Sequence, residues 1–111
     1  MVMTTCPTFY ANIWIAGDLR DAEAACRTFC MDKGLCVSVT PTKFIYTGGA
    51  EDGVCVRLIN YPRFPKTPEE IVQTASELAE FLRSVLCQWS YSIETPTTTF
   101  WQTHRVEREN G

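Results

Sequence analysis

The residues best suited to binding chemistry lie in a short proline-rich segment, Tyr61-Pro-Arg-Phe-Pro-Lys-Thr-Pro68. Its prolines restrict the backbone, so Tyr61, Arg63 and Phe64 are held within a narrow range of positions. Aromatic and arginine side chains often dominate binding energy, and a rigid loop loses little entropy on docking. The segment is therefore a candidate binding surface. A plain connector between a strand and a helix explains it equally well.

A second candidate surface comes from alternate residues of two predicted strands, at residues 9–16 and 54–61. Trp14 and Arg57 fall on the sides of these strands that carry aromatic and polar residues. Trp101, near the end of the chain, extends the aromatic character. A face of this kind suits recognition, and it also suits a second small core beneath the last strand or a partner subunit.

No arrangement of residues indicates catalysis or a metal centre. The single histidine, His104, has no evident partner in the sequence, and the chain has no Cys-x-x-Cys pair. A nucleophile built from Cys36 or Cys55 with His104 is the weakest of three functional hypotheses, because only tertiary contacts would assemble it. We expect no catalytic residue, no metal site and no cofactor.

The bulk composition excludes several classes of protein. A net charge of -3 and a sequence pI near 5.1 argue against general nucleic-acid binding. The apolar runs are much shorter than the roughly 20 residues that cross a bilayer. The six cysteines fall mostly within apolar patterns, which is typical of reduced cysteines in the cytoplasm. We therefore expect a cytoplasmic protein without a membrane partner.

The elements that position these residues can be predicted from periodicity, caps and turns. Residues 35–61 are expected to form a long hairpin turning at Gly48, Gly49 and Gly53, and all other elements pack onto it. The other predicted elements are a strand at 9–16, a helix at 19–33, a helix at 68–86, a strand at 88–94 and a strand at 98–106. The segments are grouped as a flexible leader at 1–8, a single α+β domain at 9–106 and a frayed tail at 107–111.

The order β-α-β-β-α-β with a further C-terminal strand predicts a ferredoxin-like, split β-α-β fold. Both predicted helices are amphipathic, so both should cover one face of an antiparallel sheet. Right-handed connections put the first and third strands in the middle of this sheet. The second strand then lies at an edge, where Pro41 is tolerated although it cannot donate a ladder hydrogen bond.

Two segments, GLCVSVTPTKFIYTGG and RLINYPRFPKTPEEI, resemble small orphan proteins encoded by bacteriophages and prophages. The resemblance covers residues 12–101, includes no catalytic motif and transfers no functional residue. It implies an accessory protein acting in the host bacterial cytoplasm, one that blocks a defence complex or sequesters its nucleotide signal.

The expected function is that of a non-enzymatic phage-type protein that binds and inhibits a bacterial host component. The alternative is a small-ligand or nucleotide-binding module that sequesters a signal molecule by stacking and charge pairing. The partner is accordingly a host protein or a small nucleotide, and a homodimer is expected because an open sheet face tends to be covered. The expected binding residues are Trp14, Arg57, Tyr61, Arg63, Phe64 and Trp101.

Overall fold

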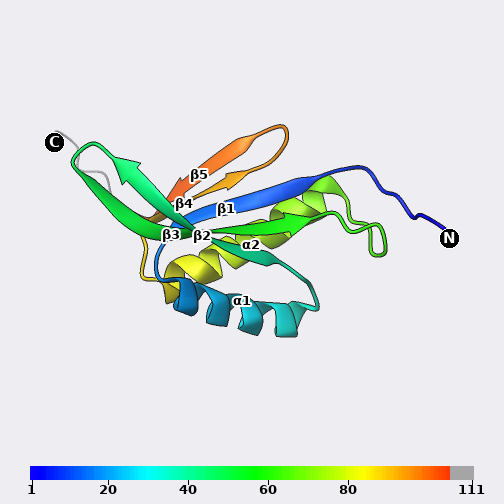
Figure 1. Cartoon of the computed structure of the whole chain (residues 1–111), viewed down its shortest axis with the longest axis horizontal. Helices are drawn as coiled ribbons and strands as arrows, with labels where there is room; N and C mark the ends of the chain where they lie inside the picture. Colours follow the sequence, from blue (N-terminus) through cyan, green and yellow to red (C-terminus); the bar gives the residue numbers. More distant parts are fainter. Residues whose placement is uncertain (106–111) are drawn as a thin grey trace.

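Five antiparallel strands form one sheet, and both helices cover the same face of it (Figure 1). The structure is a computed structural model that describes residues 1–105, so the tail predicted at 107–111 lies outside the described residues. The elements are β1 (Tyr10–Ala16), α1 (Leu19–Lys33), β2 (Ser38–Tyr46), β3 (Gly49–Ile59), α2 (Pro68–Val85), β4 (Ser90–Glu94) and β5 (Thr99–Thr103).

The strand order β2-β3-β1-β4-β5 confirms the predicted ferredoxin-like arrangement. The first and third strands are central, and β2 forms one edge with Pro41 opposite Val54. Proline lacks a backbone N–H, so an edge strand accommodates it without losing a bond to an outer neighbour. The helices leave the other face of the sheet bare.

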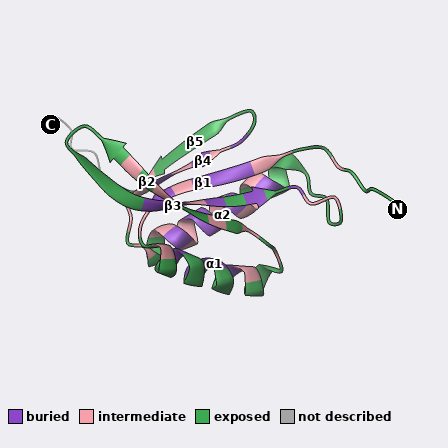
Figure 2. Ribbon diagram, viewed as in Figure 1, coloured by how far each residue is buried: buried purple, intermediate pink, exposed green. Residues whose placement is uncertain are grey.

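The core lies between the sheet and the two helices, as the buried positions in Figure 2 show. Alternate residues of β1 and β3 face inward, and each helix contributes one apolar stripe. The largest fully buried side chains are Ile13, Ile15, Val54, Val56, Leu78 and Leu82. Within residues 1–105, neither helix combines the length and the hydropathy needed to cross a bilayer.

Both helices begin where their capping residues predict. The Asp18 side chain accepts a hydrogen bond from the Asp21 backbone N–H at 3.1 Å, and Gly34 ends α1 with a positive φ of 68°. Thr67 and Glu70 form a reciprocal capping box at the start of α2. These contacts join residues close in the chain, so the helix starts can be predicted from the local sequence.

The predicted hairpin forms from β2 and β3, but its turn is shorter than the glycine pattern predicts. The prediction that the chain also turns at Gly49 and Gly53 is wrong, because both lie in β3. Only Thr47 and Gly48 lie outside the ladder, and Gly48 takes the positive φ of 89° that a tight turn requires. Gly53 lies inside β3, where a Cβ would stand 2.7 Å from the Ile15 carbonyl oxygen and against the Phe44 ring. Close packing, and not turn geometry, explains this glycine.

The last two strands are shorter than predicted. The chain after α2 continues in a turn in which the Gln88 N–H donates to the Arg83 carbonyl at 3.0 Å, so β4 begins only at Ser90. The first strand likewise begins at Tyr10, one residue later than expected. Strand β5 ends at Thr103, and the next N–H, that of His104, donates to the Trp89 carbonyl at 2.7 Å.

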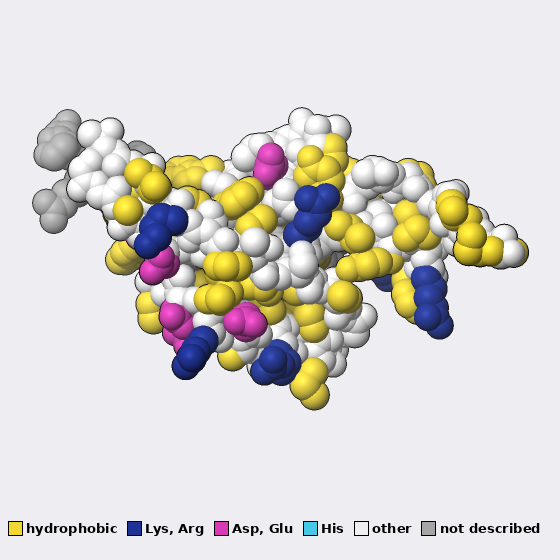
Figure 3. Space-filling model, in the orientation of Figure 1, with side chains coloured by type: hydrophobic (Ala, Val, Ile, Leu, Met, Phe, Trp, Pro, Cys, Tyr) yellow, Lys and Arg dark blue, Asp and Glu magenta, His cyan; other side chains and the backbone are white. Residues whose placement is uncertain are grey.

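Charged side chains are dispersed over the face of the molecule in Figure 3. Lys and Arg there are separated from one another and interspersed with Asp and Glu. A protein that follows a nucleic-acid backbone needs a continuous basic track, and this face offers none among the described residues.

A polar cluster fastens the end of β5 to α2. Glu80 Oε2 accepts hydrogen bonds from the Tyr91 hydroxyl at 2.6 Å and from His104 Nε2 at 3.0 Å, and Oε1 lies 3.2 Å from Arg83 Nε. Burial raises the pKa of Glu80, but hydrogen bonds from Tyr91, His104 and Arg83 together bring that pKa below its ordinary value of 4.5. The ionised carboxylate therefore stabilises the fold.

This cluster predicts an acid-dependent loss of stability. A carboxyl group whose pKa is lower in the folded state stabilises the fold above its unfolded pKa, and the contribution disappears as pH falls through the folded pKa. We expect Glu80→Gln to lower Tm at neutral pH and to flatten the fall in Tm between about pH 5 and pH 3. Thermal unfolding across this range measures both effects. Glu77→Gln, one turn earlier and exposed, should follow the wild type.

Candidate functional site

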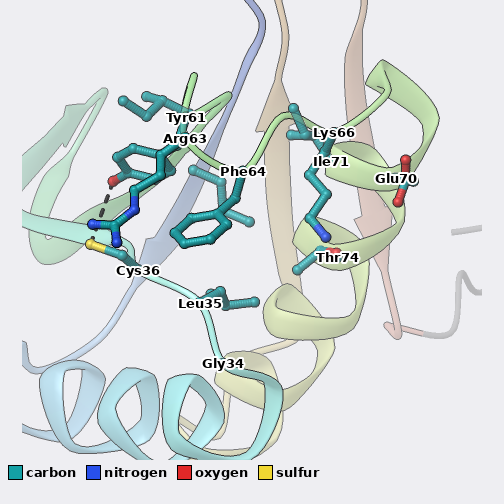
Figure 4. Close-up of a pocket in the computed structure, with 12 residues that line it drawn as sticks. Gly34, Leu35, Cys36, Tyr61, Arg63, Phe64, Lys66, Glu70, Ile71 and Thr74 are labelled. Carbon is teal, nitrogen blue, oxygen red and sulfur yellow. Dashed lines mark hydrogen bonds between the residues drawn. The ribbon is translucent and has the colours of Figure 1, made fainter. Parts of the chain in front are cut away.

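A pocket of about 470 Å³ opens where the end of α1, the end of β3 and the first turns of α2 meet (Figure 4). Its walls are mainly apolar and come from Leu35, Leu58, Ile59 and Ile71. A cavity of this size and lining is typical of small-molecule sites. The proline-rich segment predicted as a binding surface forms its upper rim in Figure 4.

Asn60 holds this proline-rich segment in place. It is 9% exposed; its Oδ1 accepts a hydrogen bond from the Lys66 N–H at 2.8 Å, and its Nδ2 donates to the Pro7 carbonyl at 2.9 Å. Its backbone N–H also donates to Phe9 at 3.0 Å. Sequence reasoning missed this residue. An asparagine directly between a strand and a proline-rich loop is the signal that would have indicated it.

Two aromatic residues of the segment form one side of the pocket. The Phe64 N–H donates to the Tyr61 carbonyl at 2.9 Å, which closes a tight turn and directs the Phe64 ring toward the cavity (Figure 4). The Tyr61 hydroxyl donates to Cys36 Sγ at 3.4 Å. This hydrogen bond, followed by burial, raises the pKa of Tyr61, so the phenol remains protonated at neutral pH. Phe64 is 65% exposed, so a ligand can cover its ring.

Charged groups stand at the rim and not in the walls. Arg63 lies over the Phe64 ring at 5.3 Å, and Lys66 extends along the opposite side of the ring in Figure 4. Hydrogen bonds from the backbone and then the side chain of Thr67 lower the pKa of Glu70, which stays ionised at the outer edge. The pocket therefore suits a small molecule with an aromatic body and both signs of charge.

The capping box that forms this edge yields a stability prediction. Thr67→Ala removes the side-chain acceptor for the Glu70 N–H, which lies 3.1 Å away. We expect the free energy of unfolding to fall by about 1 kcal/mol, the usual cost of a lost N-cap. Urea denaturation measures this loss. Thr28→Ala, at an exposed threonine within α1, is the control and should change stability little.

The six predicted binding residues divide between two faces of the molecule. Tyr61, Arg63 and Phe64 line the pocket, whereas Trp14 and Trp101 lie on the bare face of the sheet beside a groove of about 450 Å³. Arg57 also belongs to the bare face. The structure therefore does not gather the six residues into one site. Tyr61, predicted at the end of the strand at 54–61, lies beyond the end of β3 at Ile59 and lines the pocket.

The cysteines and the histidine do not combine into an active site within residues 1–105. His104 binds Glu80, and Cys36 accepts from Tyr61. Burial raises the pKa of Cys26 to about 12 and also raises that of Cys55, which disfavours their thiolates. All six cysteines are free thiols, and the described residues hold no group of three metal-ligating side chains.

No protein-family model matches the chain, and no curated protein does. Two solved structures are similar to it. The structure of a phage SAM lyase in the apo state has a TM-score of 0.76 at 17% identity, covering 90% of this chain and 92% of that one. A phage SAM lyase in complex with S-methyl-5'-thioadenosine has a TM-score of 0.72 at 16% identity, covering 93% and 95%.

These comparisons correct three expectations. The chain was expected to be non-enzymatic, to inhibit a bacterial host component, and to have a host protein or small nucleotide as its partner. Both similar structures are of a lyase, and one of them contains a small molecule. The prediction of a non-enzymatic protein depended on the absence of a catalytic motif from the sequence. A site assembled by tertiary contacts does not require such a motif. The comparisons agree better with the small-ligand alternative, and they lend the predicted homodimer no support.

At this level of identity the likeness establishes the fold alone. It extends over nine-tenths or more of both chains. The chain therefore has a ferredoxin-like fold that is similar to that of a phage SAM lyase, and it has a pocket at the start of α2.

Proposed function

We propose that this protein is a lyase that binds S-adenosylmethionine in the pocket at the start of α2 and releases S-methyl-5'-thioadenosine. The two similar solved structures support the reaction, and the pocket supports the position. A phage or prophage origin, which the sequence resemblance implies, is part of the same proposal.

The observation that carries the proposal is the distribution of polarity in the pocket. Apolar walls surround the cavity, an exposed aromatic ring faces it, and charges of both signs stand only at its rim. S-adenosylmethionine has a matching layout: a purine, a sulfonium centre, and an amino acid end with an ammonium and a carboxylate. Phe64 would stack on the purine, while Arg63 and Lys66 would pair with the carboxylate.

The apolar walls also favour the reaction itself. In the proposed step the bond between the sulfonium sulfur and the γ-carbon of the amino acid chain breaks, and the sulfur keeps the electron pair. The positively charged sulfonium thus becomes a neutral thioether. An apolar environment destabilises the charged ground state more than a transition state in which this charge is already fading. Leu35, Leu58 and Ile71 provide that environment.

The reaction needs little chemical help from the protein. The γ-carbon gains its new bond from the carboxylate of the same amino acid chain, which closes a lactone and needs no water or external base. The alternative, loss of a β-proton to form an alkene, requires a base next to the substrate. Among the described residues that line the pocket, Glu70 is the only carboxylate, and it stands at the solvent edge. Internal closure therefore fits the pocket better, and positioning is the main contribution of the protein.

Mass spectrometry tests this function. The purified chain is incubated with S-adenosylmethionine, and S-methyl-5'-thioadenosine and the four-carbon product are quantified against a sample without protein, because sulfonium compounds also decompose unaided. We expect release to exceed the unaided rate by at least about 10⁶-fold, the lower end of enzymatic rate enhancement. Release at the unaided rate would exclude a lyase. Tight binding without release would instead leave the chain as a small-ligand binding module.

A further inference from the structure

A row of polar side chains crosses the bare face of the sheet from β3 through β1 to β4. Arg57 is the register partner of Asn12, and Asn12 is the register partner of Glu94. Residues directly opposite one another in antiparallel strands point to the same face. Because neighbouring strands are about 4.8 Å apart, the backbones of Arg57 and Glu94 are separated by roughly 10 Å with Asn12 between them.

The two charged members of this row do not pair with each other. The Arg57 guanidinium lies over the Tyr10 ring at 4.6 Å. Glu94 Oε1 accepts from Trp14 Nε1 at 3.0 Å and from Asn12 Nδ2 at 3.4 Å. The ion pairs formed within residues 1–105 include neither Arg57 nor Glu94. A cation and an anion are thus held apart on either side of Asn12, each by its own neighbours.

Asn12, in the middle of the row, has a side-chain oxygen without a hydrogen-bond partner among residues 1–105. Asn12 is 8% exposed, and its Oδ1 is buried without a hydrogen-bond partner among the described residues. Its Nδ2 is directed to Glu94, so the oxygen points away from that carboxylate. An unpaired buried acceptor is costly, and such groups in native proteins usually have a donor. Arg57 is exposed and held by a single ring contact, so it can move to admit one.

We propose that this row binds the α-amino acid group of a small molecule. The ligand's carboxylate pairs with the Arg57 guanidinium, and its ammonium pairs with Glu94 and donates one hydrogen to Asn12 Oδ1. With opposite charges on either side of an amide, the row can bind both ends of a zwitterion, whereas a simple anion or cation would satisfy only one end. Trp14 and Tyr10, on either side of the row, contact the ligand's side chain. The site is separate from the pocket and does not depend on the lyase proposal.

Two-dimensional NMR of the Trp14 indole N–H provides a direct test, because this group donates to Glu94. We expect L-methionine to shift the Trp14 indole resonance with a Kd of about 1 mM or tighter. N-acetyl-L-methionine lacks the ammonium and L-methionine methyl ester lacks the carboxylate, so neither should shift it comparably. Absence of a shift with L-methionine, or equal shifts with all three compounds, would overturn the proposal.

Variants show whether the shift of the Trp14 indole resonance arises from binding to this row of side chains. Arg57→Gln and Glu94→Gln should each weaken L-methionine binding by at least about tenfold, since each removes one charge-assisted contact. Glu94→Gln keeps a carbonyl acceptor for Trp14, so an unchanged indole position without ligand shows that the face is intact. Lys43→Gln is the control, because Lys43 pairs with Asp52 at 2.8 Å on the exposed hairpin. Unweakened binding in both row variants would contradict the assignment.

The α-amino acid group has two sources, a free amino acid or the amino acid end of an S-adenosyl compound. S-adenosyl-L-homocysteine contains the group and should shift the Trp14 indole resonance if the site accepts S-adenosyl compounds. If the site accepts only free amino acids, L-methionine should shift this resonance and S-adenosyl-L-homocysteine should not. S-methyl-5'-thioadenosine lacks the group, and an equal shift with it would count against the proposal. The response to L-methionine should persist in Phe64→Ala, so failure of the pocket and failure of the row are distinguishable.

Discussion

Replacing Phe64 with alanine is expected to weaken binding of S-methyl-5'-thioadenosine by about 5- to 150-fold, which corresponds to the ~1–3 kcal/mol that stacking of a base on an aromatic ring contributes. Phe64 is 65% exposed and its ring points toward the pocket, so removal of the ring takes away a ligand contact and little of the core. Isothermal titration calorimetry measures the affinity, and the same variant should release product more slowly from S-adenosylmethionine.

Phe100→Ala is the matched control for this experiment. Phe100 is also a partly exposed phenylalanine, at 43%, but it lies on β5 and outside the pocket lining. Its removal should leave the affinity for S-methyl-5'-thioadenosine unchanged. If both variants bind as the wild type does, the pocket at the start of α2 is not the ligand site. If both lose affinity equally, the effect comes from general destabilisation.

Asn60→Ala is expected to lower the free energy of unfolding more than the other variants proposed here, and also to weaken ligand binding. The variant removes the acceptor for the Lys66 N–H and the donor to the Pro7 carbonyl. Leaving buried groups unpaired costs about 1–3 kcal/mol each, and partial access to water lowers the sum, so we expect a loss of roughly 2–3 kcal/mol in the free energy of unfolding. The segment carrying Phe64 should also lose its position, which lowers ligand affinity.

Asn60→Asp separates the two roles of this residue. The aspartate keeps an oxygen acceptor for the Lys66 N–H, so the proline-rich segment should retain its shape, but it cannot donate to Pro7. Urea denaturation and titration calorimetry on both variants give the comparison. We expect Asn60→Asp to bind ligand better than Asn60→Ala. Wild-type stability and affinity in Asn60→Ala would show that the segment is positioned by its prolines alone.

The helices were the most predictable part of the fold because their ends depend on adjacent residues. Asp18 and Gly34 bound α1, and Thr67 with Pro68 starts α2, in each case by contacts within a few residues. The strand ends were less predictable because they depend on partners far along the chain. Gly53 shows this, since the reason for a glycine there is the Ile15 carbonyl of another strand.

The candidate site was predictable only in part. Tyr61, Arg63 and Phe64 could be predicted from the sequence, because the prolines next to them restrict the backbone. The other half of the pocket includes Leu35 and Ile71, which the packing of α1 against α2 brings together. The assumption that a missing motif means a missing activity was the larger error. In the proposed lyase reaction the substrate contains its own leaving group and nucleophile, so the reaction would require positioning more than a catalytic motif.

The sequence by itself determined the order of the elements, the helix boundaries, the edge position of β2 and the rigidity of the segment before α2. These features arise from backbone restrictions and hydrophobic periodicity, which act between residues close in the chain. The tertiary structure alone decided that Trp14 and Phe64 face different sites and that Asn60 anchors the loop. It also decided that Arg57 and Glu94 lie on either side of Asn12 and do not pair with each other. Those relations depend on strand register and on packing between distant segments, and no local pattern encodes either.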